Sequence, residues 1–464
     1  MRIVLADLKG LRGFVSKDTV AAGYGSRLQP FSRTTSVLCR IKTQLHDPPS
    51  VQMAYLAAIA ADAGHEVVFT HGDQIPGDVA IVLSSLVDYR HEAAWADEMR
   101  ALGVRVGFVG LTASKMPELF VDHADFVITG EPEEAFSRLA RGESLSGIVA
   151  SGEVDDLDTL PFPRWDLLVS RRHDREVPGS VRPLHGGYPV LASRSCPEFC
   201  TYCPHRILST YRSRSVESIA DELQYLCERH ARPYVIFRDP LFSQDRERSI
   251  ALCSQIERRK LTLRFECETR LDRLDTALLD RLHAAGLRAM SFGVESVSPS
   301  TLKKAGRRPI PTAQQRTIVD HCQRLGIVTA AFYVLGFLED DWTSIGVTID
   351  YSASLGSTFA QFKLLTPYPG TPLWKQMAPR IFETDWQKFD GFTPTFHHPS
   401  LTPSELTFLI GAAYTRFYMR PSWLSNYLGI GSSRVRHYVS KLDDRVSARH
   451  TRQEIAAMSR AVVC

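Results

Sequence analysis

Short apolar runs alternate with helical stretches over the first 148 residues. Residues 66–70 and 79–83 have the apolar pattern of buried strands, and residues 51–63 repeat apolar side chains with a helical period that stops at Gly64. The runs that predict strands here span residues 3–6, 66–70, 79–83, 104–109 and 125–129. Because apolar strands that alternate with helices form parallel sheets covered on both faces, we expect a doubly wound, Rossmann-like α/β domain over residues 1–148.

A second series of strand–helix units begins at residue 189. Apolar runs predict six strands, at residues 190–193, 234–237, 261–267, 288–292, 328–334 and 359–365. Helical patterns lie between them, for example at residues 246–258 and 312–325, and each apolar run ends in a turn marked by polar, Gly or Pro residues. These units predict a partial (β/α)6 barrel over residues 189–375, with its functional groups at the carboxyl ends of the strands.

The segments outside these two domains have a different character. Residues 149–188 are rich in proline and are expected to form an extended linker. Residues 10–50 form a long Gly-, Ser- and Arg-rich loop, which is typical either of a segment that reaches a neighbouring active site or of a surface excursion. Thr402 and Glu405 form a capping-box pattern at the start of a helix, and we expect residues 376–464 to make a helical cap on the barrel.

Composition narrows the class of protein. The 464 residues carry a net charge of +3 with 23% charged side chains, so nothing indicates a nucleic-acid partner or a polybasic membrane patch. No apolar run approaches the roughly 20 residues that span a bilayer, and the N-terminus reaches Asp7 without a cleavage site. Most of the nine cysteines are scattered, which argues against a disulfide framework. We therefore expect a cytoplasmic protein.

Three cysteines form a motif. Cys196, Cys200 and Cys203 follow the first predicted barrel strand at the spacing C-x3-C-x2-C. Three thiolates on one short loop can hold three irons of a cubane cluster and leave the fourth iron open, whereas ordinary electron-transfer clusters use four cysteines. A zinc site is the alternative. Zinc ligands usually come as two knuckles or as a knuckle with histidines, and here only His205 lies close.

The loop resembles that of the radical S-adenosylmethionine (radical SAM) enzymes. The resemblance implies a 4Fe-4S cluster held by Cys196, Cys200 and Cys203, whose open iron binds the amino and carboxylate groups of S-adenosylmethionine (AdoMet). It also implies that one electron from the cluster cleaves AdoMet to a 5'-deoxyadenosyl radical, which abstracts hydrogen from a small-molecule substrate. Tyr202 matches the aromatic residue beside the adenine. A reducing partner such as flavodoxin or ferredoxin is implied as well.

The same resemblance assigns AdoMet contacts at the ends of later strands. Asp239 stands where the family contacts the AdoMet amino group, although the sequence there differs from the family's Gly-Gly-Glu form. Glu268 and Arg270 occupy the position that commonly touches the ribose or carboxylate. Gly293 and Glu295 fit the glycine–glutamate motif near the adenosine. For the two glutamates, the alternative is a structural ion pair with a nearby arginine.

The N-terminal domain resembles the cobalamin-binding domain that precedes the barrel in many radical SAM enzymes, with two departures. Lys9 occupies the place of the histidine that ligates cobalt, and a protonated lysine has no lone pair for a metal. The glycine pair that lets the backbone approach the cofactor tail reads Gly110-Leu111. Some cobalamin-dependent relatives also lack the histidine. We nevertheless expect cobalamin to be absent.

Two reactions compete on these features. The chain length and the altered first domain resemble the radical SAM diol dehydratases of aminoglycoside (apramycin-type) antibiotic biosynthesis, which remove a sugar hydroxyl with a reductase partner, and this is the reaction we expect. The alternative is cobalamin-dependent methylation of an unactivated carbon. A third hypothesis, of a different class, is a non-catalytic iron–sulfur or zinc scaffold, against which the polar ends of the six predicted barrel strands argue. No motif identifies the substrate or the carbon attacked.

Overall fold

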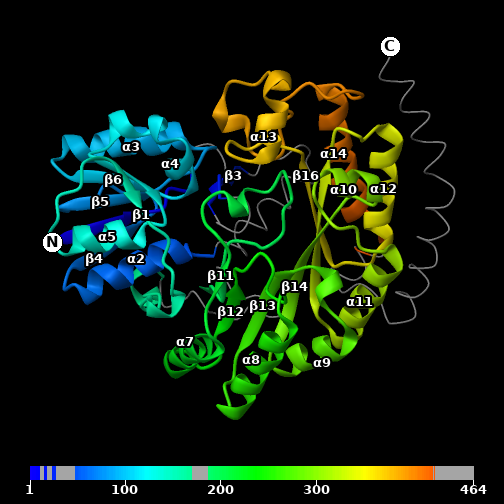
Figure 1. Ribbon diagram of the computed structural model, residues 1–464, viewed down its shortest axis with the longest axis horizontal. Helices are drawn as coiled ribbons and strands as arrows, with labels where there is room; N and C mark the ends of the chain where they lie inside the picture. Colours follow the sequence, from blue (N-terminus) through cyan, green and yellow to red (C-terminus); the bar gives the residue numbers. More distant parts are fainter. Residues whose placement is uncertain (11–14, 18–22, 28–47, 170–186, 422, 424–464) are drawn as a thin grey trace.

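Two parallel sheets, each of six strands, form the body of the protein (Figure 1). The computed structural model describes residues 1–10, 15–17, 23–27, 48–169, 187–421 and 423. Most of the predicted loop 10–50, part of the predicted linker and most of the predicted C-terminal tail therefore lie outside the described residues. The described helices include none with the length and apolar character that crossing a bilayer requires.

The N-terminal sheet has the strand order β4-β1-β5-β6-β7-β8. Its strands are β1 (Arg2–Ala6), β4 (Glu66–Thr70), β5 (Val79–Leu83), β6 (Arg105–Val109), β7 (Phe126–Gly130) and β8 (Gly147–Ser151). Alternate side chains of β1 enter two cores: Ile3 packs with helices on one face and Val4 with a helix on the other. The first face is covered by α2 (Val51–Asp62) and α5 (Glu133–Ala140), the second by α3 (Tyr89–Ala101).

The strands that follow β1 are added on both sides of it. β4 lies on one side of β1 and β5 on the other. In open α/β sheets such a reversal opens a crevice at the carboxyl ends of the two strands, where ligands bind. The last strand of this sheet, β8, ends at Ser151, three residues after the predicted domain limit at residue 148. The predicted domain boundaries remain predictions.

The second sheet runs in sequence order from β9 to β16, with β9 and β16 at its edges. Its strands are β9 (Tyr188–Val190), β12 (Tyr234–Phe237), β13 (Arg264–Thr269), β14 (Leu287–Glu295), β15 (Val328–Leu335) and β16 (Phe359–Leu364). All neighbours are parallel, and Figure 1 shows helices along its outer side. These helices are α7 (Val216–Arg229), α8 (Arg246–Arg258), α9 (Thr276–Ala284), α11 (Thr312–Leu325) and α12 (Trp342–Ser354).

The last described helix, α14 (Pro403–Tyr418), closes one edge of this sheet. The capping box predicted for its start is present: Thr402 and Glu405 satisfy each other's backbone N–H groups. Tyr414 and Tyr418 then use their hydroxyls to bind backbone groups of β16, including a bond of 2.7 Å to the carbonyl oxygen of Ala360. An edge strand whose polar groups are covered in this way no longer offers a template for aggregation.

The remaining elements are short. They are β2 (Val15–Ser16), β3 (Ser26–Arg27), α4 (Leu111–Lys115), α6 (Trp165–Leu168), β10 (Ser193–Arg194), β11 (Arg212–Ser213), α10 (Pro299–Lys304), α13 (Pro372–Met377) and 3-10 turns at residues 117–119, 121–123, 157–159, 204–206, 271–273, 378–380 and 386–388.

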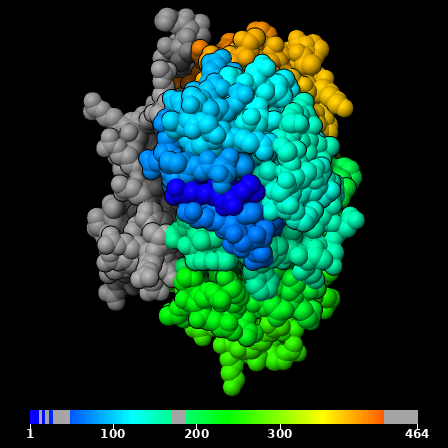
Figure 2. Space-filling model, turned by 90° about the vertical axis from the view of Figure 1, so that its left-hand side faces the viewer, coloured from blue at the N-terminus to red at the C-terminus, as the bar shows by residue number. Residues whose placement is uncertain are grey.

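The two halves are packed against each other. Figure 2, viewed from the N-terminal side, shows that half directly above the green barrel segments and below the orange C-terminal ones. Tyr24 carries part of the contact: its ring stacks on Tyr368 at 5.4 Å, and its hydroxyl donates to the carbonyl oxygen of Pro369 at 2.6 Å. The described part of the long N-terminal loop thus reaches the carboxyl end of the barrel, as one of its two predicted roles required.

Candidate functional site

The cysteine motif forms a loop between β10 and β11 that two distant segments hold in place. The backbone N–H of Thr201 donates to Ala305 beyond α10 (2.9 Å), and the Thr201 carbonyl accepts from Leu373 in α13 (3.0 Å). Cys196, Cys200 and Cys203 are all free and half-buried. The loop is therefore anchored at its centre, and its three cysteines are neither fully exposed nor fully buried.

The three thiols lie close enough to affect one another. Burial raises the pKa of Cys196 and Cys203, and the charge of Cys200 raises both further. A bound metal reverses this effect, because it stabilises the thiolates. Among the described residues, no three His, Cys, Asp or Glu side chains are placed to hold one metal ion together. Each thiolate of a cubane cluster binds a different iron, so a cluster does not require such convergence. The donor set fits three sites of a cluster.

Arg307, which the sequence analysis did not single out, connects this loop to β14. Its guanidinium donates to the carbonyl oxygen of Gly293 (2.6 Å) and to the Cys200 sulfur (3.9 Å), and it lies 3.5 Å from a Glu295 carboxylate oxygen. The tertiary fold brings Arg307 next to the cysteine loop, and no local sequence pattern marks this arginine. A fixed positive charge therefore stands between a predicted cluster ligand and a predicted AdoMet contact.

Gly293 is required for this arrangement. A Cβ at residue 293 would lie 2.1 Å from a Glu295 carboxylate oxygen and 2.7 Å from an Arg307 nitrogen. The strand register shifts between Gly293 and Glu295, and Glu295 has a φ of 65°. A non-glycine residue in the left-handed region costs about 1–2 kcal/mol, and such strain concentrates at functional sites.

Tyr202 presents an unsatisfied polar group beside Glu295. Its hydroxyl is buried and has no hydrogen-bond partner among the described residues, and its ring makes an edge contact of 5.6 Å with Phe337. Burial raises the pKa of Tyr202, and the charge of Glu295 raises it further. An orphaned buried hydroxyl calls for a ligand or a water molecule.

Glu268 brings a second carboxylate to the same region. Its pKa is raised to about 7, mainly by burial; Arg238 opposes the shift and Glu295 adds to it. Two glutamates at the ends of neighbouring strands, each resisting ionisation, suit a ligand that carries positive charge.

Two other predicted contacts are held by partners outside this group. Asp239 is fully buried and accepts hydrogen bonds from the Ala192 N–H (3.1 Å) and the Ser193 hydroxyl, so it fixes the end of β9. Arg270 forms a two-bond ion pair with Asp272 (both 2.9 Å). The structure therefore brings Tyr202, Glu268, Gly293 and Glu295 together, with Arg270 close enough for its charge to lower the pKa of Glu295, and it leaves Asp239 in a supporting position.

On the N-terminal side, lysines fill the crevice beside β1. Lys9 donates to Asp7 at 2.8 Å. The buried Lys17 donates to the carbonyl oxygen of Leu83 (2.9 Å) and pairs with Glu92 (2.8 Å). The lysine that replaces a metal-ligating histidine is thus drawn onto its neighbouring carboxylate.

A cavity separates the carboxyl ends of the two sheets. Glu131 and Glu133, which follow β7, line it from one half, and Ser195 and His205, which flank the cysteine motif, line it from the other. Arg194 crosses between the halves and pairs with Glu131 (3.0 Å) and Glu133 (2.6 Å). The second carboxylate oxygen of Glu133 is buried and has no partner among the described residues. The cavity therefore offers an unsatisfied acceptor next to the cysteine loop.

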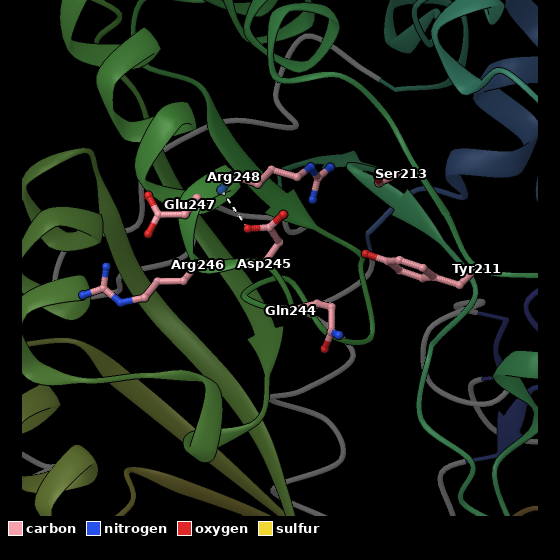
Figure 3. A pocket seen from close by; sticks show the side chains of 7 residues that line it. All are labelled: Tyr211, Ser213, Gln244, Asp245, Arg246, Glu247 and Arg248. Atoms are coloured by element: carbon pink, nitrogen blue, oxygen red, sulfur yellow. Dashed lines mark hydrogen bonds between the residues drawn. The ribbon is translucent and has the colours of Figure 1, made fainter.

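A different cavity, of about 460 Å³, lies at the start of α8 (Figure 3). Tyr211 and Arg248 reach toward its centre, whereas Arg246 points away. Asp245 caps the helix by accepting from the backbone N–H of Arg248 at 3.0 Å. No predicted site residue lines this cavity, so it is separate from the strand-end group.

Residues 190–345 match the profile of the radical SAM superfamily. This part of the chain is a radical SAM domain. The match contains the cysteine loop and the ends of β12 to β15, so the site described above belongs to the radical SAM domain.

Curated relatives extend the similarity beyond the radical SAM domain. An uncharacterized methyltransferase of Pyrococcus horikoshii is 26% identical over 323 residues, which cover 65% of this chain and 68% of the relative. The bacteriochlorophyllide d C-12(1)-methyltransferase of Chlorobaculum tepidum is 25% identical over 349 residues, or 72% and 74% of the two chains.

Solved structures share the fold of both halves. The radical SAM methyltransferase TsrM of Kitasatospora setae, with cobalamin and a 4Fe-4S cluster bound, matches with a TM-score of 0.62 and 15% identity over 96% of this chain and 99% of that one. The cobalamin-dependent enzyme OxsB, with aqua-cobalamin and AdoMet bound, matches with a TM-score of 0.61 and 13% identity over 96% and 71%. These matches confirm the predicted α/β fold class, a Rossmann-like domain followed by a partial barrel.

Two expectations need correction. The expected absence of cobalamin is contradicted by the structures of TsrM and OxsB cited above, which share this fold over both halves and hold cobalamin. The expectation rested on Lys9 and on the altered glycine pair at Gly110-Leu111, whereas the strand order that places a crevice beside β1 is retained. The relatives are also named mostly as methyltransferases, which favours methylation, the alternative reaction, over dehydration.

Proposed function

We propose that the chain is a cobalamin-dependent radical SAM methyltransferase that acts on a carbon of a small-molecule substrate. One observation carries this proposal: the cavity between the halves is lined both by residues that follow β7 and by residues that flank the cysteine motif. A methyl carrier bound to the N-terminal domain and AdoMet bound at the cysteine loop would therefore face a common space. Dehydration would need no carrier there.

The proposed ligands of the cluster are Cys196, Cys200 and Cys203. When bound, the cluster supplies one electron for AdoMet cleavage and cobalamin supplies a carrier for the methyl group. The protein's own residues would bind these groups and orient them toward the substrate. The Cys200 sulfur accepts from Arg307, which keeps positive charge beside that thiolate.

The strand-end group is the proposed AdoMet site. Glu268 and Glu295 provide two buried carboxyl groups whose ionised form a cationic ligand would stabilise, and the Tyr202 hydroxyl has no hydrogen-bond partner among the described residues. Gly293 leaves the space in which Glu295 and Arg307 meet. Asp239 acts indirectly, because it fixes the end of β9, the strand that leads into the cysteine loop.

The cluster is tested by Cys200→Ala after anaerobic reconstitution. With dithionite as reductant, we expect the wild-type protein to bind about four irons and cleave AdoMet, and the variant to lose cleavage. Cys253→Ala, at a buried cysteine on α8, is the matched control and should retain both properties. Equal cleavage by the Cys200 variant would refute the cluster assignment.

The reaction class is tested with cobalamin and labelled AdoMet. Titration with hydroxocobalamin should reach one corrinoid per chain, and AdoMet with a deuterated methyl group should add three mass units above the unlabelled methyl product. A product that loses water and gains no labelled methyl group would contradict methyl transfer while leaving the radical SAM chemistry in place.

A further inference from the structure

The cysteine loop exposes a phenylalanine. Phe199 has 73% of its surface exposed, the largest fraction among the large hydrophobic side chains of the described residues. It is bonded directly to Cys200, a proposed cluster ligand. Scattered exposed hydrophobic residues are normal on protein surfaces, so exposure alone assigns nothing to Phe199.

One basic side chain covers this ring, and two more basic residues end the neighbouring helix α10. The guanidinium of Arg206, also exposed, lies 3.4 Å from the ring centroid. On the other side, α10 ends in Lys303 and Lys304, and its final turn touches the loop: a Cβ on Gly306 would lie 2.5 Å from the Phe199 carbonyl oxygen. We call Arg206, Lys303 and Lys304 the basic rim of Phe199.

The acidic residues nearby are already neutralised. Glu198 pairs with Arg273 (3.3 Å), and Glu339 pairs with Lys304 (3.2 Å). Asp272 is shared by Arg270 and Arg308. Within the part of the chain that the structure describes, neither Arg206 nor Lys303 forms an ion pair with a carboxylate. The basic rim therefore keeps a positive charge.

We propose that the basic rim is the docking surface for an acidic one-electron carrier protein that reduces the cluster. The inference rests on the proposed function, which requires one electron per AdoMet cleaved. One electron passes from the carrier to the cluster, the carrier is oxidised by one electron, and no atom is transferred. Charge complementarity supplies the recognition, since complementary charges accelerate protein encounter by 10- to 1,000-fold.

The geometry fits a brief redox encounter. Such complexes bury small areas and need an apolar centre within a charged rim. Phe199 provides the centre, one peptide bond from a cluster ligand, so a carrier seated on it would bring its redox group near the cluster. The cavity of Figure 3 is less suited, because Arg246 at its edge already pairs with Asp275 at 3.0 Å.

The test compares two reductants on the holoenzyme. In the double variant Arg206→Glu/Lys303→Glu, we expect cluster reduction by photoreduced flavodoxin to slow at least tenfold at low salt, while reduction by dithionite is unchanged. Added salt should slow the wild-type reaction with flavodoxin and have little effect on the variant. The matched control Arg141→Glu/Arg258→Glu reverses two exposed charges elsewhere and should behave as wild type.

Phe199→Ala gives an independent readout. Its iron content should match that of the wild type, and its rate with flavodoxin should fall with dithionite reduction intact. If both the double variant and Phe199→Ala react with flavodoxin at wild-type rates, the proposal is overturned. It is overturned as well if these changes alter self-association of the protein while leaving those rates unchanged. Failure of dithionite to drive AdoMet cleavage in the wild-type protein would refute the proposed function itself, so the two failures are distinguishable.

Discussion

At residue 293 the absence of a side chain permits contact between two charged groups. Gly293 has no Cβ, and the Glu295 carboxylate and the Arg307 guanidinium occupy the space that one would fill. Arg307 in turn reaches Cys200. A change of one methyl group at this position is therefore transmitted to both the proposed AdoMet site and the proposed cluster.

Gly293→Ala should weaken AdoMet binding by about tenfold, which corresponds to about 1.4 kcal/mol. The added methyl group displaces Glu295 and Arg307, because both lie within 3 Å of its position. Equilibrium binding of AdoMet to the reconstituted protein measures the effect. Gly411→Ala, in α14 with nothing within 4 Å, is the control and should gain about 0.5–1 kcal/mol of stability without changing affinity. Unchanged affinity in Gly293→Ala would remove this pair from the site.

The raised pKa of Glu268 leads us to expect that the stability of the protein depends on pH. Burial raises its pKa from the ordinary value to about 7, so the carboxyl ionises more readily in the unfolded chain than in the folded one. The folded state therefore loses stability as the pH rises from about 5 to about 7, and no further loss is expected well above the folded pKa. Denaturant unfolding of the ligand-free protein should show this loss relative to Glu268→Gln. Asp340, whose pKa is also raised to about 7, titrates in both proteins and cancels. Parallel pH profiles would contradict the shift.

Among the elements, the turn after α10 determines how the cysteine loop is held. Gly306 has a φ of 70° and touches the Phe199 carbonyl oxygen, and Ala305 accepts a hydrogen bond from Thr201. Gly326, at the end of α11, has nearly the same φ of 71° but has nothing within 4 Å of where a Cβ would lie. Comparing substitutions at these two glycines therefore distinguishes the effect of backbone strain, which both would have, from the effect of contact with the cysteine loop, which only Gly306 would have.

Alanine at either glycine should cost about 1–2 kcal/mol of stability, because both adopt the left-handed conformation. Only Gly306→Ala should also lower the iron and sulfide bound per chain after anaerobic reconstitution, since its methyl group pushes against the cysteine loop. Iron and sulfide analysis of both variants measures the difference. Equal and full iron content would show that the contact does not position the ligands.

Elements with a strong apolar pattern were predictable from the sequence, and those without one were not. The runs at residues 79–83 and 246–258 correspond to β5 and α8. β8 was missed because this edge strand is mostly exposed and has little apolar pattern. β13 extends two residues beyond its predicted end, because Glu268 and the buried Thr269 continue the strand. The role of Arg307 depends on a tertiary contact across 107 residues, which no local pattern encodes.

At the scale of the whole molecule, buried ion pairs join the two halves. Glu131, after β7, pairs with Arg194 and with Arg212, and it also accepts from the Val154 backbone N–H at 2.8 Å. These arginines lie beside the cysteine loop in β10 and β11. The interface is therefore electrostatically coupled to the segment that carries the proposed cluster ligands.

Glu131→Ala should destabilise the protein by about 3 kcal/mol, because it removes the buried carboxylate that two largely buried arginines share and leaves Arg194 with Glu133 alone and Arg212 with the more distant Glu153. Glu153→Ala, at a carboxylate that is 34% exposed and 3.6 Å from Arg212, is the matched control and should cost about 1 kcal/mol or less. Chemical denaturation of both variants gives the comparison. A cost below about 1 kcal/mol for Glu131→Ala would mean that the halves are held together mainly by apolar contacts.

The bond from Tyr24 to Pro369 spans 345 positions and sets an order of events during synthesis. At roughly 5–20 residues per second, a ribosome needs on the order of 20 to 70 seconds to make the second partner after the first has emerged. Until then the Tyr24 ring lacks the barrel surface that covers it, and the segment at residues 23–27 is held only by its contacts with the first half, such as that of Arg27 with Asp88. A nascent chain stalled before residue 369 should therefore be cut by protease in this segment, whereas the released full-length protein should resist.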